Sequence, residues 1–212
     1  MKKIGLYFGS FNPIHNGHVH IANYALSKLH LDLLFFVVSP QNPFKHKTDL
    51  LSFESRVEMV KIICDQNSNY QVCDIEKYLP TPSYTYDTLK ELEKQYPNAQ
   101  FTIIMGGDNF LTIDKWKQSE YIMSQSLLII PRILHDDNAK TNPYERLLMK
   151  KDNITQKNGN CNIIIADDVK LMLISSTEIR HKIKNHMNVN DSVDEKVLKY
   201  IYDNNLYQNG KL

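Results

Sequence analysis

Cysteine is scarce in this chain. Cys64, Cys73 and Cys161 are an odd number at scattered spacings, and no Cys-x-x-Cys pair is present to hold a metal ion or a redox couple. A reduced compartment suits this cysteine usage, so we expect a cytoplasmic protein.

Long apolar runs and an excess of one charge are also missing. After its charged start, the N-terminus carries only about five apolar residues, too few for a signal peptide or a membrane span. The formal net charge of +1 gives no electrostatic argument for binding to nucleic acid or to a membrane surface. There is no internal repeat and no low-complexity tract. These absences are typical of an ordinary globular protein without a membrane span or a strongly charged binding surface.

The chain does have enough apolar residues for a full core: 42% of its 212 residues are hydrophobic. One domain over 1–212 is expected, with a small helical part from about residue 176. Continuous apolar runs such as Leu33–Val38 indicate strands buried on both faces of a parallel sheet, and they alternate with segments of helical periodicity. We therefore predict an α/β fold with a doubly wound parallel sheet of five or six strands, of Rossmann type. Candidate strands lie at 4–8, 33–38, 70–75, 100–105, 127–131, 161–166 and 171–174.

Several helix ends can be predicted from capping residues. Ser52 is expected to cap a helix in which Arg56 and Glu58 belong to the solvated face. The polar stretch before residue 160 is expected to hold one short helix, 144–151. A capping box at Ser192–Glu195 predicts a last helix that serves packing alone.

The most informative stretch is Gly9–His18, which follows a predicted strand and leads into a helix from about Asn16. Glycines let a ligand approach the backbone, and a helix N-terminus presents unpaired N–H groups and the positive end of its dipole. His15 and His18 would share one face there, and each imidazole can donate an N–H to a phosphate oxygen. A lone histidine near a helix start is more often a capping or surface residue, but two histidines beside these glycines favour an anion site.

A second helix start suited to phosphate is predicted near the C-terminus. Ser175 and Glu178 form a capping box, and Thr177 and Arg180 share a face in the first turn. The hydroxyl and the guanidinium are both phosphate ligands, and the guanidinium can bind in a forked manner. The alternative is a well-capped helix with a surface arginine, and the occurrence of two such helix starts in one short chain argues against it.

Three stretches between these sites carry further candidates. The basic loop 39–47 contains Lys45, which suits phosphate or substrate contact as well as it suits a solvated turn. Thr85 is the predicted N-cap of a helix whose first N–H groups could hold a carboxylate or phosphate. Asp108 follows two glycines at a strand end, where it could accept hydrogen bonds from ribose hydroxyls. Trp116 is the only tryptophan, and by frequency alone it favours a core position over a ring platform.

The two helix starts resemble the motifs of one enzyme superfamily. His15-Asn-Gly-His18 resembles the (T/H)xGH signature of the nucleotidylyltransferases, and Gly9–Pro13 resembles the G-(S/T)-F-(D/N)-P sequence that precedes it. Ile174–Arg180 matches their ISSTxIR motif. The resemblance implies catalytic roles for His15, His18 and Arg180. It implies ATP binding by Gly9, Ser10, Phe11, His15, His18, Ser176, Thr177 and Arg180.

The middle of the chain resembles one branch of that superfamily, the bacterial nicotinate mononucleotide adenylyltransferases. Ser83–Leu89 is similar to their (P)SYTxDTL element, and Asp108 with Trp116 is similar to a pattern in which the indole stacks on the pyridine ring. An indole face also attracts an electron-poor pyridinium. The resemblance implies that the mononucleotide is bound by Lys45, Thr85, Asp108 and Trp116.

The activity implied by the resemblance is transfer of AMP from ATP to nicotinate mononucleotide, which gives deamido-NAD and pyrophosphate. Mg²⁺ would arrive with ATP, because no carboxylate cluster suggests a protein cage for the ion. One alternative is another small-substrate enzyme of the superfamily, such as a phosphopantetheine adenylyltransferase or a cytidylyltransferase, which would lack the Thr85 and Trp116 elements. Another is a non-catalytic nucleotide-binding module, against which the two histidines argue. Oligomeric state and the choice between acid and amide mononucleotides stay open.

Overall fold

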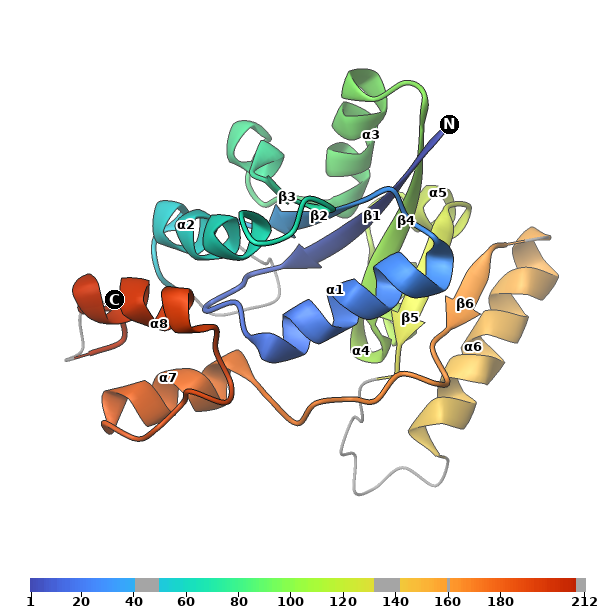
Figure 1. Ribbon diagram of the computed structural model, residues 1–212. Helices are drawn as coiled ribbons and strands as arrows, with labels where there is room; N and C mark the ends of the chain where they lie inside the picture. Colours follow the sequence, from blue (N-terminus) through green and yellow to red (C-terminus); the bar gives the residue numbers. More distant parts are fainter. Residues whose placement is uncertain (41–49, 132–141, 160, 209–212) are drawn as a thin grey trace.

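A computed structural model describes residues 1–40, 50–131, 142–159 and 161–208 of the chain. Its centre is a sheet of six parallel strands in the order β3-β2-β1-β4-β5-β6 (Figure 1). The predicted doubly wound α/β fold is therefore confirmed. The strands are β1 Lys2–Gly9, β2 Leu33–Val38, β3 Tyr70–Cys73, β4 Ala99–Gly106, β5 Ser126–Ile130 and β6 Ile163–Ile165.

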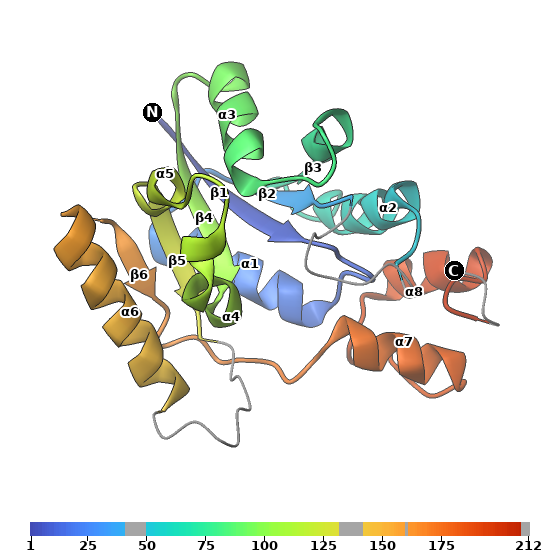
Figure 2. The same ribbon diagram turned by 180° about the vertical axis from the view of Figure 1, so that it is seen from behind.

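Helices cover both faces of the sheet, and each face has its own apolar core (Figures 1 and 2). One face is covered by α1 Asn16–Leu29 and α2 Phe53–Cys64, and α7 Ser176–Lys184 and α8 Glu195–Asp203 pack beside these two helices beyond the carboxyl end of β1. The other is covered by α3 Thr85–Gln95, α4 Gly107–Leu111, α5 Ser119–Met123 and α6 Pro143–Asn158, with the short 3₁₀ turns η2 Ile75–Tyr78 and η3 Ile113–Lys115. No helix among the described residues is long and apolar enough to cross a membrane.

The alternation of side chains along β2 explains its uninterrupted apolar sequence. Leu34, Phe36 and Val38 belong to the core on the α1 face, whereas Phe35 and Val37 belong to the core on the α3 face. Successive side chains of a strand point to opposite faces, so a strand covered on both sides needs apolar residues at every position. In the strand order β3-β2-β1-β4-β5-β6, the direction in which successive strands are added reverses between β1 and β4. Open sheets of this type bind ligands at such a point, at the carboxyl ends of the strands.

Three predictions about elements near the C-terminus were wrong. The segment 171–174 pairs with no strand among the described residues, and Leu173 is 89% exposed, so its apolar run is a connection from β6 to α7. Helix α6 is longer than the expected 144–151, because Leu147 and Ile154, seven residues apart, anchor it to the core. The N-cap of α8 is Asp194, which accepts hydrogen bonds from two backbone N–H groups of its first turn, so the capping box expected at Ser192 does not form.

Candidate active site

The loop after β1 ends in a pair of stacked histidines. His15 is the N-cap of α1, and its Nδ1 accepts a 3.3 Å hydrogen bond from the backbone N–H of His18. The Nδ1 of His18 accepts a 3.3 Å bond from the backbone N–H of His15 in return. The two rings stack with their centroids 3.7 Å apart. This reciprocal capping box holds both imidazoles on one face of the helix start, as the predicted helix boundary at Asn16 required.

The capping box also fixes the tautomer of both rings. A ring nitrogen that accepts a hydrogen bond carries no proton, so a neutral imidazole bonded in this way has its proton on Nε2. Each histidine then acts as an Nε2–H donor at the positive end of the α1 dipole. Two such donors on one face are suited to the non-bridging and bridging oxygens of a phosphate chain.

The side chain of Phe11 anchors this loop to the hydrophobic core. Its side chain is 2% exposed, its backbone φ is 46°, and its ring meets the ring of His18 edge-on at 5.1 Å. A Cβ at Gly9 would lie within 3.0 Å of that ring, so glycine is required at position 9 for Phe11 to fold back over the strand end. The Phe11 side chain thus belongs to the core, and only its backbone can serve the predicted contact with ATP.

Helix α7 meets this loop directly, although the two segments are far apart in the sequence. Arg180 Nη1 donates a 2.9 Å hydrogen bond to the carbonyl of Asn12, and Ser176 Oγ donates one of 3.0 Å to the carbonyl of Pro13. The second terminal nitrogen of Arg180 lies 3.5 Å from Thr177 Oγ1. The hydroxyl and guanidinium of α7 therefore stand beside the helix start that carries the two histidines. The structure thus brings the two predicted phosphate elements into contact.

Arg56 was predicted on the solvated face of α2, and that prediction was wrong. Its side chain is 1% exposed, and burial lowers its pKa to about 10, which still leaves it charged at neutral pH. The guanidinium and Nε–H donate to four backbone carbonyls at 2.7–3.1 Å, those of Ser10, Ser39, Pro40 and Leu51. Arg56 therefore ties the loop after β1 to the end of β2. The spacing from Arg56 to the buried Val60 and Ile63 was a signal that could have placed it on the inner face.

A second connection in this loop comes from residues near the C-terminus. Asn12 is 5% exposed, and its Oδ1 accepts a 2.9 Å hydrogen bond from the hydroxyl of Tyr207 and a 3.3 Å bond from the backbone N–H of Leu51. Burial raises the pKa of the Tyr207 hydroxyl above its ordinary value, which keeps it a donor. The last helix was predicted to serve packing alone, and Tyr207 lies beyond it. No sequence pattern at Tyr207 signalled this contact.

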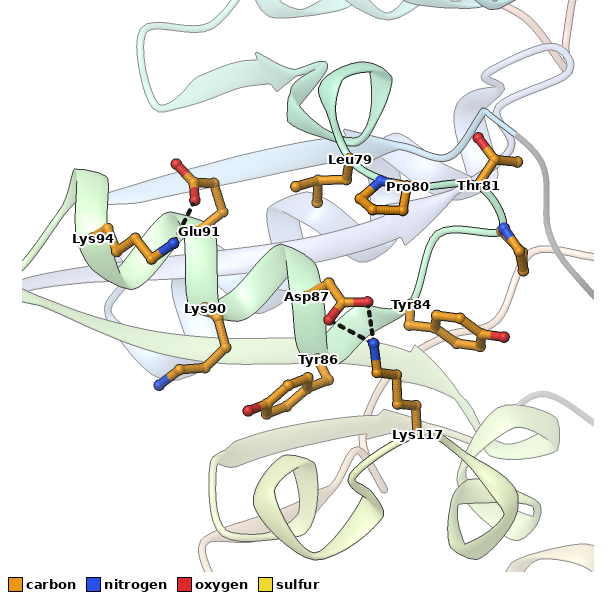
Figure 3. A pocket seen from close by; sticks show the side chains of 11 residues that line it. Leu79, Pro80, Thr81, Tyr84, Tyr86, Asp87, Lys90, Glu91, Lys94 and Lys117 are labelled. Atoms are coloured by element: carbon orange, nitrogen blue, oxygen red, sulfur yellow. Dashed lines mark hydrogen bonds and ion pairs between the residues drawn. The ribbon is translucent and has the colours of Figure 1, made fainter.

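Helix α3 and the η3 turn form a second group of predicted residues. The N-cap of α3 is Tyr84, without a side-chain capping bond, so Thr85 is the first residue of the helix and the predicted cap was off by one position. Lys117, next to Trp116, pairs with Asp87 of α3 at 2.8 Å and lies over the Tyr84 ring at 5.2 Å (Figure 3). The segments of Thr85 and Trp116 are therefore neighbours.

Trp116 is half-buried, at the end of η3, and packs against the core on the α3 face. Asp108 is exposed in the first turn of α4, just beyond the end of β4. A Cβ at Gly106 would collide with Asp108 Oδ1, so glycine permits the carboxylate to fold back over the strand end. Lys45 lies outside the described residues, and its predicted contact stays a prediction.

A groove of about 390 Å³ lies along α3 and the segment that precedes it (Figure 3). Its walls include the segment 79–82, Tyr84, Tyr86 and the basic side chain of Lys117. Neither Thr85 nor Trp116 lines it. The groove therefore does not coincide with the predicted mononucleotide contacts.

Comparison with known proteins identifies the family. The model of the family described as Cytidylyltransferase-like matches residues 6–182. A protein of Flavobacterium johnsoniae designated "Probable nicotinate-nucleotide adenylyltransferase" is 38% identical over 206 residues, which cover 97% of this chain and 99% of that protein. This chain belongs to the nicotinate-nucleotide adenylyltransferase family, within the cytidylyltransferase-like proteins.

Two further matches span the whole chain. A Clostridium tetani protein with the same designation is 34% identical over 98% of this chain and 100% of its own length. The structure of Plasmodium falciparum nicotinic acid mononucleotide adenylyltransferase complexed with NaAD superposes with a TM-score of 0.72 and 24% identity, covering 98% of both chains. That likeness shows the shared fold. Family membership agrees with the motifs at both helix starts.

Proposed function

We propose that this chain transfers the AMP unit of ATP to the 5′-phosphate of nicotinate mononucleotide, giving deamido-NAD and pyrophosphate. The observation that carries the proposal is the 2.9 Å hydrogen bond from Arg180 to the Asn12 carbonyl, which brings the two elements suited to phosphate together. The names of its relatives, 38% and 34% identical to it, support the same reaction. The protein is then an enzyme of NAD biosynthesis.

The reaction needs positioning and charge stabilisation. The mononucleotide phosphate is already an anion at neutral pH, so it can attack the α-phosphorus of ATP in line without a general base, while the bond to pyrophosphate breaks. The Nε2–H groups of His15 and His18 would donate to the α-phosphate oxygens and to the bridge to the leaving group. Because the capping box holds both rings in place, their orientation costs no reorganisation as charge develops on those oxygens.

In this proposal the β- and γ-phosphates of ATP are bound by residues of α7. Thr177 supplies a hydroxyl and Arg180 a guanidinium beside the same loop, both suited to the β- and γ-phosphates, with Ser176 and the backbone of Gly9 and Ser10 lining the path. Among the described residues, no group of three or more His, Cys, Asp or Glu side chains could hold a metal ion. We propose that Mg²⁺ enters on ATP, where it would neutralise phosphate charge and keep most of its waters.

The mononucleotide would lie beyond the carboxyl end of β4 and at the start of α3, with its 5′-phosphate directed toward the α-phosphorus of ATP. In this arrangement Asp108 accepts hydrogen bonds from the ribose hydroxyls, and the indole of Trp116 stacks on the pyridine ring. The N–H groups at Thr85 would bind the nicotinate carboxylate, and Lys45 would contact the phosphate.

One assay tests the proposed function. Purified protein is incubated with Mg²⁺, ATP and, in turn, nicotinate mononucleotide, nicotinamide mononucleotide or 4′-phosphopantetheine, and pyrophosphate release is followed together with the product mass. We expect release with the nicotinate substrate and a product of the mass of deamido-NAD. Release with phosphopantetheine alone would favour the first alternative. ATP binding in a calorimeter without pyrophosphate release in any mixture would favour a non-catalytic module.

Arg180→Ala is expected to raise the KM for ATP by about tenfold to a hundredfold, because a charge-assisted contact with a phosphate is lost. The KM for the mononucleotide should change much less. Lys184→Ala, an exposed cation on the same helix, is the matched control and should leave both constants unchanged. Equal effects of the two substitutions would mean that Arg180 acts only through the general positive field.

Trp116→Ala is expected to raise the KM for nicotinate mononucleotide by about tenfold, on the scale of one lost aromatic stacking contact. Since the side chain is half-buried against the core, some loss of thermal stability should accompany it. Trp116→Phe, which retains a ring, should recover most of the affinity. If all substitutions at this position changed only the melting temperature, Trp116 would be a core residue without a binding role.

A further inference from the structure

A buried carboxyl lies beneath the first turn of α3. Glu76, in η2, is only 2% exposed, and its Oε1 accepts a 2.9 Å hydrogen bond from Thr88 Oγ1. Its Oε2 and the nearby Ser83 Oγ are without solvent contact and without a hydrogen-bond partner among the described residues. Burial raises the pKa of Glu76, and the hydrogen bond from the Thr88 hydroxyl opposes that rise.

Such a residue is costly for a fold to keep. A buried carboxyl loses its hydration, and an apolar residue of the same volume would avoid that cost. The groups around Glu76 come from the end of β2, where Ser39 lies, and from both sides of the α3 start, where Ser83 and Thr88 lie. Glu76 thus joins the start of α3 to the sheet.

The start of α3 is held on its outer side by Lys117, which pairs with Asp87 and lies over the Tyr84 ring, and on its inner side by Glu76. Its N-cap, Tyr84, supplies no side-chain capping bond. The Thr88 hydroxyl lies 3.3 Å from the Tyr84 carbonyl and 2.9 Å from Glu76, so it connects the first turn to the buried carboxyl. The contact between Thr88 and Glu76 is therefore the inner attachment of the turn that contains the Thr85 backbone.

We propose that Glu76 is a positioning residue for the mononucleotide, which fixes the first turn of α3 through Thr88 without touching the substrate. The inference rests on the proposed function, in which the N–H groups at Thr85 bind the nicotinate carboxylate. Ser39, near Glu76, donates a 3.0 Å backbone hydrogen bond to the carbonyl of Gly9, so Glu76 also has an indirect link to the proposed ATP loop. Thr88 contacts Glu76 on the α3 side alone, so loss of the bond between them is expected to act mainly on the mononucleotide.

The test uses three variants of the full chain and measures kcat and both KM values by pyrophosphate release. Glu76→Leu and Thr88→Val each remove one side of the contact at similar volume, and Glu76→Gln keeps an acceptor for the Thr88 hydroxyl. We expect the first two to raise the KM for nicotinate mononucleotide about tenfold, the equivalent of one lost buried hydrogen bond, with the KM for ATP within about twofold of wild type. Glu76→Gln should stay close to wild type. The matched control is Glu58→Leu, an exposed glutamate of α2, which should change neither constant.

The possible outcomes separate this inference from the proposed function. Equal rises in both KM values, or a lower melting temperature with unchanged constants, would make Glu76 a structural residue and overturn the inference. If Glu76→Leu does not fold, Thr88→Val decides by the same split between the two substrates. A wild-type protein that releases no pyrophosphate from ATP and nicotinate mononucleotide would overturn the proposed function and this inference together. If the wild type is active but the variants do not raise the KM for the mononucleotide selectively, only the inference is overturned.

Discussion

His18→Ala is expected to lower turnover by about a hundredfold or more, with the fold intact. The substitution removes the Nε2–H donor that we propose stabilises charge on the α-phosphate, and losses of this size are typical when one preorganised donor to a transition state is removed. It also removes one bond of the capping box, at a cost of about 1 kcal/mol, which leaves most of a small protein's stability in place. His18 is the cleaner choice of the two histidines, because His15 is itself the N-cap and is buried.

The measurement is kcat under saturating substrates, with a thermal melt on the same sample. His181→Ala, an exposed histidine of α7, serves as the control and should keep both turnover and melting temperature. Near-normal turnover of a folded His18→Ala protein would remove His18 from the mechanism. A large drop in melting temperature together with turnover would assign His18 a capping role instead.

Arg56→Met is expected to lower the free energy of unfolding by about 3 kcal/mol or more. The methionine fills part of the space but leaves the buried carbonyl of Leu51 and the partly buried carbonyls of Ser10, Ser39 and Pro40 without their donor, and an unsatisfied buried acceptor costs about 1–3 kcal/mol. Arg56→Lys keeps a charge but cannot present donors in a fork, so an intermediate loss is expected. Urea unfolding followed by circular dichroism gives the values.

The control for this prediction is Lys61→Met, which removes an exposed cation from the same helix. Its free energy of unfolding should stay within about 0.5 kcal/mol of wild type. We further expect kcat/KM to fall in any Arg56 variant that remains folded, because Arg56 holds the loop that contains Ser10. An Arg56→Met protein as stable as Lys61→Met would mean that the four carbonyls find other donors.

The sequence predicted those parts of the molecule that depend on local patterns. The strand at Leu33–Val38 was placed to the residue, and the helix from Asn16 followed from the glycines and histidines around it. The same logic failed at 171–174, where an apolar run is not a strand, because pairing depends on a neighbouring strand that periodicity cannot supply. The length of α6 was underestimated for a related reason. Two apolar residues, Leu147 and Ile154, anchor a helix whose other residues are mostly polar.

Contacts made by long side chains across the fold were the hardest to foresee. Arg56 has the spacing of a buried position, but its charge suggested the solvated face, and only the converging carbonyls explain why it is buried. The hydrogen bond from Tyr207 to Asn12 joins residues 195 positions apart, and nothing in either local sequence points to the other. The roles of the predicted site residues in binding and catalysis stay predictions until the assays above are done.

The contacts of Asn12 also bear on when this protein can become active during its own synthesis. The histidine loop leaves the ribosome early. Arg180, which donates a hydrogen bond to the carbonyl of Asn12 in that loop, is synthesised 168 residues after Asn12, and Tyr207, which donates to the Asn12 side chain, follows later still. A nascent chain can therefore form β1 and the first turns of α1 long before it can hold a triphosphate. We expect ribosome-bound chains that end ahead of Arg180 to be unable to consume ATP, so that the activity begins only after Arg180 has been synthesised and has reached the loop.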